Sequence, residues 1–183
     1  MAKRNIKKFV CLISCIGLCS CSGRIERIQQ GQFETRNQQD PALSGNGEKL
    51  AFIVDYNGRP SVQLRDLRNG RILPLRHLSR NQPHSSPSLS WNGRYIAVIA
   101  QRRNRRLAII EDLLTGRSHQ LPIPGERTPV RLSLAPDGSQ LALQVAEKGQ
   151  WRVELFDLRE KIEPDQPIGR NFSTNSAGVD ISQ

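Results

Sequence analysis

The segment Leu132-Ser-Leu-Ala-Pro-Asp-Gly-Ser-Gln-Leu-Ala-Leu143 is the third copy of a phrase that decides the fold of this chain. The first copy, residues 41–52, reads Pro-Ala-Leu-Ser-Gly-Asn-Gly-Glu-Lys-Leu-Ala-Phe. The second, residues 87–98, reads Pro-Ser-Leu-Ser-Trp-Asn-Gly-Arg-Tyr-Ile-Ala-Val. An Asp-Leu pair follows each copy, so the repeated unit is longer than the phrase itself.

Three kinds of landmark hold one register through the copies, each advancing by 46 and then by 45 residues. A period of about 40–50 residues with short strands and turn signals is typical of a propeller blade or a similar β-repeat. The landmarks are the glycines Gly47, Gly93 and Gly138, the alanines Ala51, Ala97 and Ala142, and the aspartates Asp66, Asp112 and Asp157.

Each repeat is predicted to form up to four short strands. The first ends at Ser44, Ser90 or Ala135, before an Asn-Gly or Asp-Gly pair that favours a tight turn. The second strands are apolar nearly throughout, as expected of strands covered on both faces. We predict second strands at 49–54, 95–100 and 140–145, third strands at 61–65, 107–111 and 152–156, and fourth strands at 71–75 and 118–122. In the third repeat Arg159-Glu-Lys stands where the turn should be, so its fourth strand is doubtful.

A secretion leader precedes the repeats. A basic head and an apolar stretch, residues 9–18, are followed by small residues, which is the pattern of a signal peptide. The junction Leu18-Cys-Ser-Cys21 resembles the lipobox of bacterial lipoproteins, and this resemblance implies cleavage before Cys21 and lipid on its sulfur and amino group. All four cysteines lie in this leader, which argues against a disulfide or zinc framework in the body. An ordinary signal peptide with cysteine as apolar filler is the alternative.

The charge and the flanking segments complete the organisation. Removing the leader takes four basic residues from a chain of net charge +10, leaving 23 basic against 17 acidic residues, or +6. For a secreted protein, lipid headgroups and wall polymers are expected counterparts of this charge, and nucleic acid is not. We predict a signal peptide at 1–20, a lipid-anchored polar tether at 21–39, repeats at 40–160 and a loosely ordered tail at 161–183. Residues 24–30 form either part of the tether or a stray outer strand, because Gly23-Arg-Ile matches Gly70-Arg-Ile.

The repeats resemble the blades of TolB-type, WD-like β-propellers over residues 40–158. The matching elements are the Asn-Gly or Pro136-Asp-Gly turns, the Leu-Ala pairs, the Asp-Leu pairs and Thr115-Gly116. This resemblance implies an all-β, partial β-propeller of three recognisable four-stranded blades. It also implies a periplasmic, cell-envelope role of the Tol–Pal type. TolB-type propellers normally have six blades and a preceding α/β domain, for which this chain has no room.

Three blades raise the question of how the array ends, because closed propellers have four to eight blades. A homodimer would complete a six-bladed ring, whereas a monomer would remain an open array with unpaired strand edges. Both arrangements are compatible with the sequence.

The sequence offers few groups for catalysis or for binding a cofactor. It contains three histidines, His77, His84 and His119, which we interpret as surface residues, and it lacks the HExxH and Gly-x-Ser-x-Gly motifs. The repeated aspartates are expected to make hydrogen bonds at strand ends. We therefore predict no catalytic residue, no metal site and no cofactor, and we expect Trp91 and Trp151 to pack within the fold.

The strongest local feature is an arginine cluster at a predicted hairpin tip: Arg102, Arg103, Arg105 and Arg106. Their guanidinium groups could hold phosphate or carboxylate. The alternative is a solvated tip whose charges discourage aggregation.

The function expected from these observations is that of a noncatalytic lipoprotein on the periplasmic side of a bacterial membrane, inner or outer. Its partner would be another envelope protein, a peptidoglycan-associated component or a wall polymer. The alternative is an accessory propeller module of a peptidase or glycan-processing enzyme system.

Overall fold

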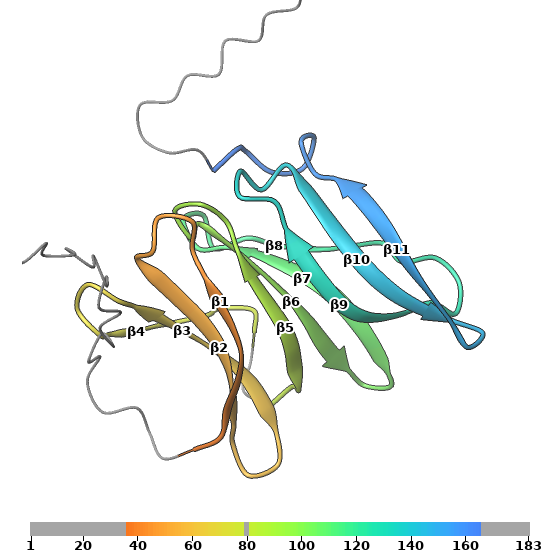
Figure 1. The fold of residues 1–183 in the computed structure, drawn as a ribbon, viewed down its shortest axis with the longest axis horizontal. Coiled ribbons are helices and arrows are strands. Elements are labelled where there is room, and N and C mark those ends of the chain that lie inside the picture. Colours follow the sequence, from red (N-terminus) through yellow and green to blue (C-terminus); the bar gives the residue numbers. More distant parts are fainter. Residues whose placement is uncertain (1–35, 79–80, 166–183) are drawn as a thin grey trace, which may run out of the picture.

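A computed structural model describes residues 36–78 and 81–165, which form three antiparallel sheets standing side by side (Figure 1). We refer to these sheets as blades 1, 2 and 3. Blade 1 contains β1 (Gln38–Leu43), β2 (Lys49–Asp55), β3 (Pro60–Asp66) and β4 (Ile72–Leu73). Blade 2 contains β5 (His84–Leu89), β6 (Tyr95–Arg102), β7 (Arg105–Asp112) and β8 (Ser118–Gln120). Blade 3 contains β9 (Thr128–Leu134), β10 (Gln140–Glu147) and β11 (Gln150–Asp157).

The predicted all-β repeat is confirmed, although the fourth strands are shorter than the predicted five residues: β4 has two residues and β8 has three. Within each blade the strands pair in chain order, so each blade is a meander with its first and last strands at opposite edges. The first strands β1, β5 and β9 contact one another from blade to blade, so they are the inner strands and the last strands are the outer ones. The second and third strands of each repeat begin within two residues of their predicted starts. Blade 3 has three strands in the described part of the chain, in agreement with the doubtful fourth strand of the third repeat.

The boundaries of the repeat region differ from the prediction at both ends. Strand β1 begins at Gln38, two residues inside the predicted tether. Of the predicted loose tail, residues 161–165 are described, and they pack against the blades: Ile162 and Asp165 are both buried. The suggested strand at residues 24–30 lies outside the described residues, as do the leader and Cys21.

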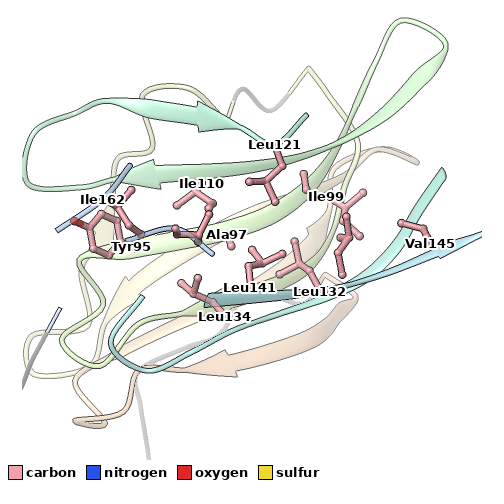
Figure 2. Packing of buried hydrophobic residues seen from close by; sticks show 13 residues of the cluster. Tyr95, Ala97, Ile99, Ile110, Leu121, Leu132, Leu134, Leu141, Val145 and Ile162 are labelled. Carbon is pink, nitrogen blue, oxygen red and sulfur yellow. The ribbon is translucent and has the colours of Figure 1, made fainter. Parts of the chain in front are cut away.

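The blades pack face to face through two apolar clusters. One lies between blades 1 and 2, where Ala51, Ile53 and Leu64 meet Ile96 and Val98. The other lies between blades 2 and 3, where buried side chains of β6 and β7 face those of β9 and β10 (Figure 2). The second strands are continuous apolar runs because the side chains on both faces of β2 and of β6 are buried.

Bulges near the start of the inner strands connect one blade to the next. The pairing of β5 with β6 shifts between Ser85 and Ser88, where Ser86 adopts a φ of 52°. This conformation presents the Ser86 side chain to β9: its Oγ accepts a hydrogen bond from Leu132 N at 2.9 Å. The backbone N–H of Ser86 donates at 3.2 Å to the carboxylate of Asp40, which is the bulge residue of β1. Ser86 thereby links its own strand β5 to both neighbouring inner strands, β1 and β9.

Candidate binding surface on the third blade

Strand β11 places an apolar row on the surface of blade 3. Trp151, Val153 and Leu155 alternate along the strand and are 65%, 74% and 67% exposed. Residues paired across strands share a face of a sheet, so Ala146, Gln144 and Ala142 of β10 lie beside this row. We call the surface formed by these six residues the outer face of blade 3.

The repeat shows why this face is unusual. Leu155 occupies the position of Leu64 in blade 1 and of Ile110 in blade 2, one repeat apart in each case. Leu64 and Ile110 are both 0% exposed, because the following blade covers them. Val153 corresponds in the same way to the buried residues Val62 and Ala108. The outer face of blade 3 therefore carries side chains of the type that a following blade covers, and no described strand covers it.

This feature corrects the expectation for Trp151, which is exposed instead of packed. Trp91 does pack: its ring lies over Gly45, where an added Cβ would stand 2.5 Å from a ring carbon. The sequence signal for the outer face was the alternation of apolar residues along 151–155. Its exposure depends on the number of blades that follow, which local sequence does not encode.

The arginine cluster is divided between two sides of its hairpin. Arg102 pairs with Arg105 and Gln101 with Arg106, so Arg102 and Arg106 lie on opposite faces of the sheet. Arg102 donates to Gln82 Oε1 at 3.4 Å, whereas Arg106 donates to Ser85 Oγ at 3.0 Å. Arg103 lies in the turn and is exposed. The structure thus does not gather all four guanidinium groups around one point.

Two of these arginines line a cleft between blades 2 and 3. Arg105 and Arg106 both line this cleft of about 590 Å³, together with Gln101, Asn104, Leu107 and most residues of the segment 120–128. Arg127, which also lines the cleft, donates to Glu154 at 2.7 Å and lies 3.5 Å from Glu147. Since Glu154 and Glu147 already balance the charge of Arg127, anion binding at this cleft would rest on Arg105 and Arg106.

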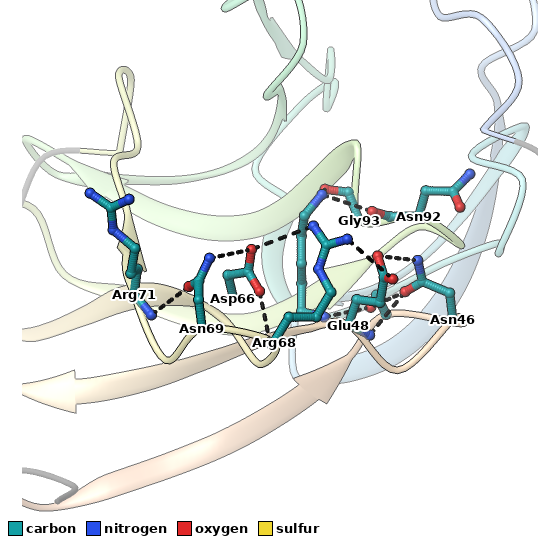
Figure 3. Close-up of polar contacts among 10 residues, drawn as sticks. Asn46, Glu48, Asp66, Arg68, Asn69, Arg71, Asn92 and Gly93 are labelled. Carbon is teal, nitrogen blue, oxygen red and sulfur yellow. Dashed lines mark hydrogen bonds and ion pairs between the residues drawn. The ribbon is translucent and has the colours of Figure 1, made fainter. Parts of the chain in front are cut away.

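The repeated aspartates and glycines shape turns. Asp66 Oδ1 accepts the N–H of Arg68 at 2.8 Å (Figure 3), and Asp112 and Asp157 likewise accept the N–H two residues further on. In the hairpin turns, Gly47, Gly93 and Gly138 have φ of 61–78° and donate to the carbonyl three residues earlier, a geometry that favours glycine.

The aspartates are held in their charged form by these contacts. Hydrogen bonds from the side chain and backbone N–H of Arg159 lower the pKa of Asp157 to about 2. For Asp66, the N–H of Arg68 is the largest cause of a lowered pKa. A general acid at neutral pH would need a raised pKa, so these carboxylates are suited to structure.

The histidines differ in their surroundings. His84 is buried between blades 1 and 2, contrary to the expectation of a surface residue, and its Nδ1 accepts the N–H of Val62 at 3.2 Å. Burial, with a contribution from Arg102, lowers the pKa of His84 to about 4, so its ring is neutral at neutral pH. Among residues 36–78 and 81–165, no group of three His, Cys, Asp or Glu side chains is placed to hold a metal ion. The same residues contain no helix with the length and apolar composition to span a bilayer.

Comparisons with known proteins identify the fold. No family model and no curated protein matches the chain. Among solved structures, TolB from Acinetobacter baumannii superposes with a TM-score of 0.55 at 20% identity, over 74% of this chain and 33% of that one. A protein described as TolB from Agrobacterium tumefaciens gives a TM-score of 0.58 at 13% identity, over 69% and 47% of the two chains. The propeller domain of the Trilobed protease from Pyrococcus furiosus, which has an open velcro topology, gives 0.52 at 18% identity, over 73% and 44%.

These likenesses confirm the predicted partial β-propeller. The chain spans less than half the length of each of these propeller proteins, in agreement with its three blades. At such identities the likeness concerns the fold and carries no partner or activity with it. Within this fold, the outer face of blade 3 is the place where a following blade would begin.

Proposed function

We propose that this chain is a noncatalytic binding module of the bacterial cell envelope, anchored through lipid on Cys21, which holds a protein partner on the outer face of blade 3. One observation carries the proposal: side chains at repeat positions that are fully buried in blades 1 and 2 are about two-thirds exposed in blade 3. An apolar surface exposed in this way is typical of a protein interaction site.

The chemistry of the partner follows from the face. Trp151, Val153 and Leu155 present an apolar row, whereas Gln144 at its centre is polar. Trp is enriched at the energetic centres of protein interfaces, and a flat apolar sheet suits another sheet packed on it. A protein therefore matches this face better than a wall polymer rich in hydroxyl and carboxylate groups. The lipobox-like junction at Cys21 supports a location on the periplasmic side of a membrane.

A second candidate function, an accessory module of a peptidase system, is favoured by the likeness to the propeller domain of the Trilobed protease. Both candidate functions use the outer face of blade 3 and differ in the identity of the partner. Identifying the partner therefore distinguishes between them.

Photo-crosslinking in intact cells tests the binding function. A photoreactive amino acid in place of Gln144, at the centre of the outer face, is expected to give an adduct with a second polypeptide. The matched control is Ser118, an exposed strand position of blade 2, where no such adduct is expected. A hydrolase in the Gln144 adduct would favour the accessory module.

The same experiment in a Cys21→Ser background tests the anchor. We expect the protein to leave the membrane fraction and the adduct to decrease, with Cys19→Ser unchanged. Equal labelling at Gln144 and Ser118 would refute the assignment of the outer face, and full retention of the Cys21→Ser protein in the membrane would refute the anchor.

A further inference from the structure

The outer edge of β11 is a second open feature of blade 3, distinct from its outer face. In blade 1 the corresponding edge of β3 pairs with β4, and in blade 2 that of β7 pairs with β8. No described strand pairs with this edge of β11. Strand β11 runs through eight residues in register with β10, without a bulge or a proline. A long regular edge of this kind is a template for pairing with another strand.

The sequence of β11 is complementary to itself when two copies run antiparallel. Val153 lies next to the middle of the strand, with Arg152 and Glu154 on either side and Trp151 and Leu155 beyond them. A two-fold axis through Val153 places Val153 opposite the partner's Val153. It also places Arg152 opposite the partner's Glu154, and Trp151 opposite the partner's Leu155. Opposite charges and apolar pairs directly across a strand pair are both stabilising.

Other registers lose this match. Symmetry requires paired residues to come from the same face, so the neighbouring symmetric registers are centred on Arg152 or on Glu154. The first places Arg152 opposite the partner's Arg152, and the second places Glu154 opposite the partner's Glu154. Like charges directly across the pair are destabilising. The charge pattern therefore selects the register centred on Val153.

The charged side chains are available for this contact. The Arg152 side chain is mostly exposed and lies 3.7 Å from Glu147, a loose contact that leaves guanidinium donors free. Glu154 accepts from Arg127 at 2.7 Å, and a carboxylate can accept several hydrogen bonds, so it can take one from the partner's Arg152 as well.

A second copy is less suited to closing a ring at this end. In ring closure, blade 1 of the partner would cover the outer face of blade 3 with its side chains at Phe52 and Val54. Both side chains are already buried, at 3% and 1% exposed. The edge of β11, in contrast, is accessible without rearrangement of either copy.

We propose that two copies of this chain associate through antiparallel pairing of their β11 edges about a two-fold axis through Val153, joining two blades 3 into one six-stranded sheet. This inference goes beyond the proposed binding function. It uses the edge of blade 3 and leaves Gln144 on the outer face free for a partner.

Cysteine crosslinking of the full chain in its native membrane tests the register. With Val153→Cys, the two thiols face each other across the axis, at the spacing of directly paired residues that a disulfide can bridge. Leu155→Cys is the matched control, because in this register its thiol and that of the partner are four residues apart, about 13 Å along the strand. Mild oxidation is expected to form the Val153→Cys dimer at least about tenfold faster than the Leu155→Cys dimer. The unsubstituted chain supplies the background from the native cysteines.

A mass measurement of the detergent-solubilised full chain completes the test. We expect a dimer for the unsubstituted chain and a monomer for Val153→Lys, which places two ammonium groups on the axis. Val153 is exposed, so this substitution leaves the fold intact. A monomeric unsubstituted chain at tens of micromolar would overturn the proposal, as would faster crosslinking at Leu155 than at Val153. Neither outcome would affect the Gln144 crosslinking result.

Discussion

Asp165→Ala is expected to lower the free energy of unfolding by about 3 kcal/mol, because it removes the buried carboxylate that accepts from the buried Ser90 hydroxyl and from two half-buried donors of Asn92. Asp165 is 5% exposed, and its Oδ2 accepts from Ser90 Oγ at 2.5 Å and from Asn92 N at 2.8 Å. Its Oδ1 accepts from Asn92 Nδ2 at 3.0 Å. These contacts hold the segment after β11 against the turn that precedes β6.

Loss of Asp165 would also loosen Ile162, which packs beside Tyr95 in the cluster between blades 2 and 3 (Figure 2). Glu163→Ala is the matched control. Glu163 is an exposed carboxylate of the same segment that contacts Arg94 at 2.9 Å, and its removal should cost less than about 1 kcal/mol. Urea unfolding followed by circular dichroism measures both variants. Equal stabilities for the two would show that Asp165 does not hold this segment.

Alanine substitution at one repeat position is expected to have very different costs in the three blades. Leu64→Ala and Ile110→Ala each remove a fully buried side chain and should cost about 3 kcal/mol, within the range for cavities in a core. Leu155→Ala, at the equivalent position of blade 3, should cost less than about 0.5 kcal/mol because its side chain is largely in water already.

The three substitutions stand at the same repeat position in the third strand of each blade, so they differ in whether a following blade covers the side chain. Urea unfolding of the purified protein measures the loss in free energy of unfolding for each variant. A cost at Leu155 similar to that at Ile110 would contradict an uncovered outer face.

The strands could be predicted from sequence because their signals are local and repeated. The Asn-Gly and Asp-Gly pairs mark the hairpin turns. Because the three copies share one register, strand positions that are ambiguous in one copy can be assigned by comparison with the other two. The doubtful fourth strand of the third repeat could be recognised because Arg159-Glu-Lys replaces the turn found in the first two repeats.

Contacts between distant segments could not be predicted in this way. Asp165 acts on Ser90 and Asn92, more than seventy residues earlier, and nothing in residues 161–165 indicates such partners. The burial of His84 depends on the packing of blade 1 against blade 2. The exposure of the outer face of blade 3 could not be predicted from the sequence around Leu155, which resembles that around the buried Leu64. It depends on whether a further blade follows.

The anion hypothesis shows a similar limit. Four arginines within five residues indicate a concentrated positive charge, but the register of a hairpin determines which side chains share a face. The pairing of Arg102 with Arg105 separates Arg102 from Arg106, so the cluster forms two smaller groups.

The most direct test of the open third blade is the rate at which a thiol reagent modifies cysteine at its three equivalent positions. In dilute, purified full chain, an open blade predicts that Leu155→Cys reacts nearly as fast as an exposed thiol. Leu64→Cys and Ile110→Cys should react at least about a hundredfold more slowly, because their modification requires the blades to separate. If Leu155→Cys reacted as slowly as Ile110→Cys, blade 3 would be covered in the purified protein, and the open partial propeller would be wrong.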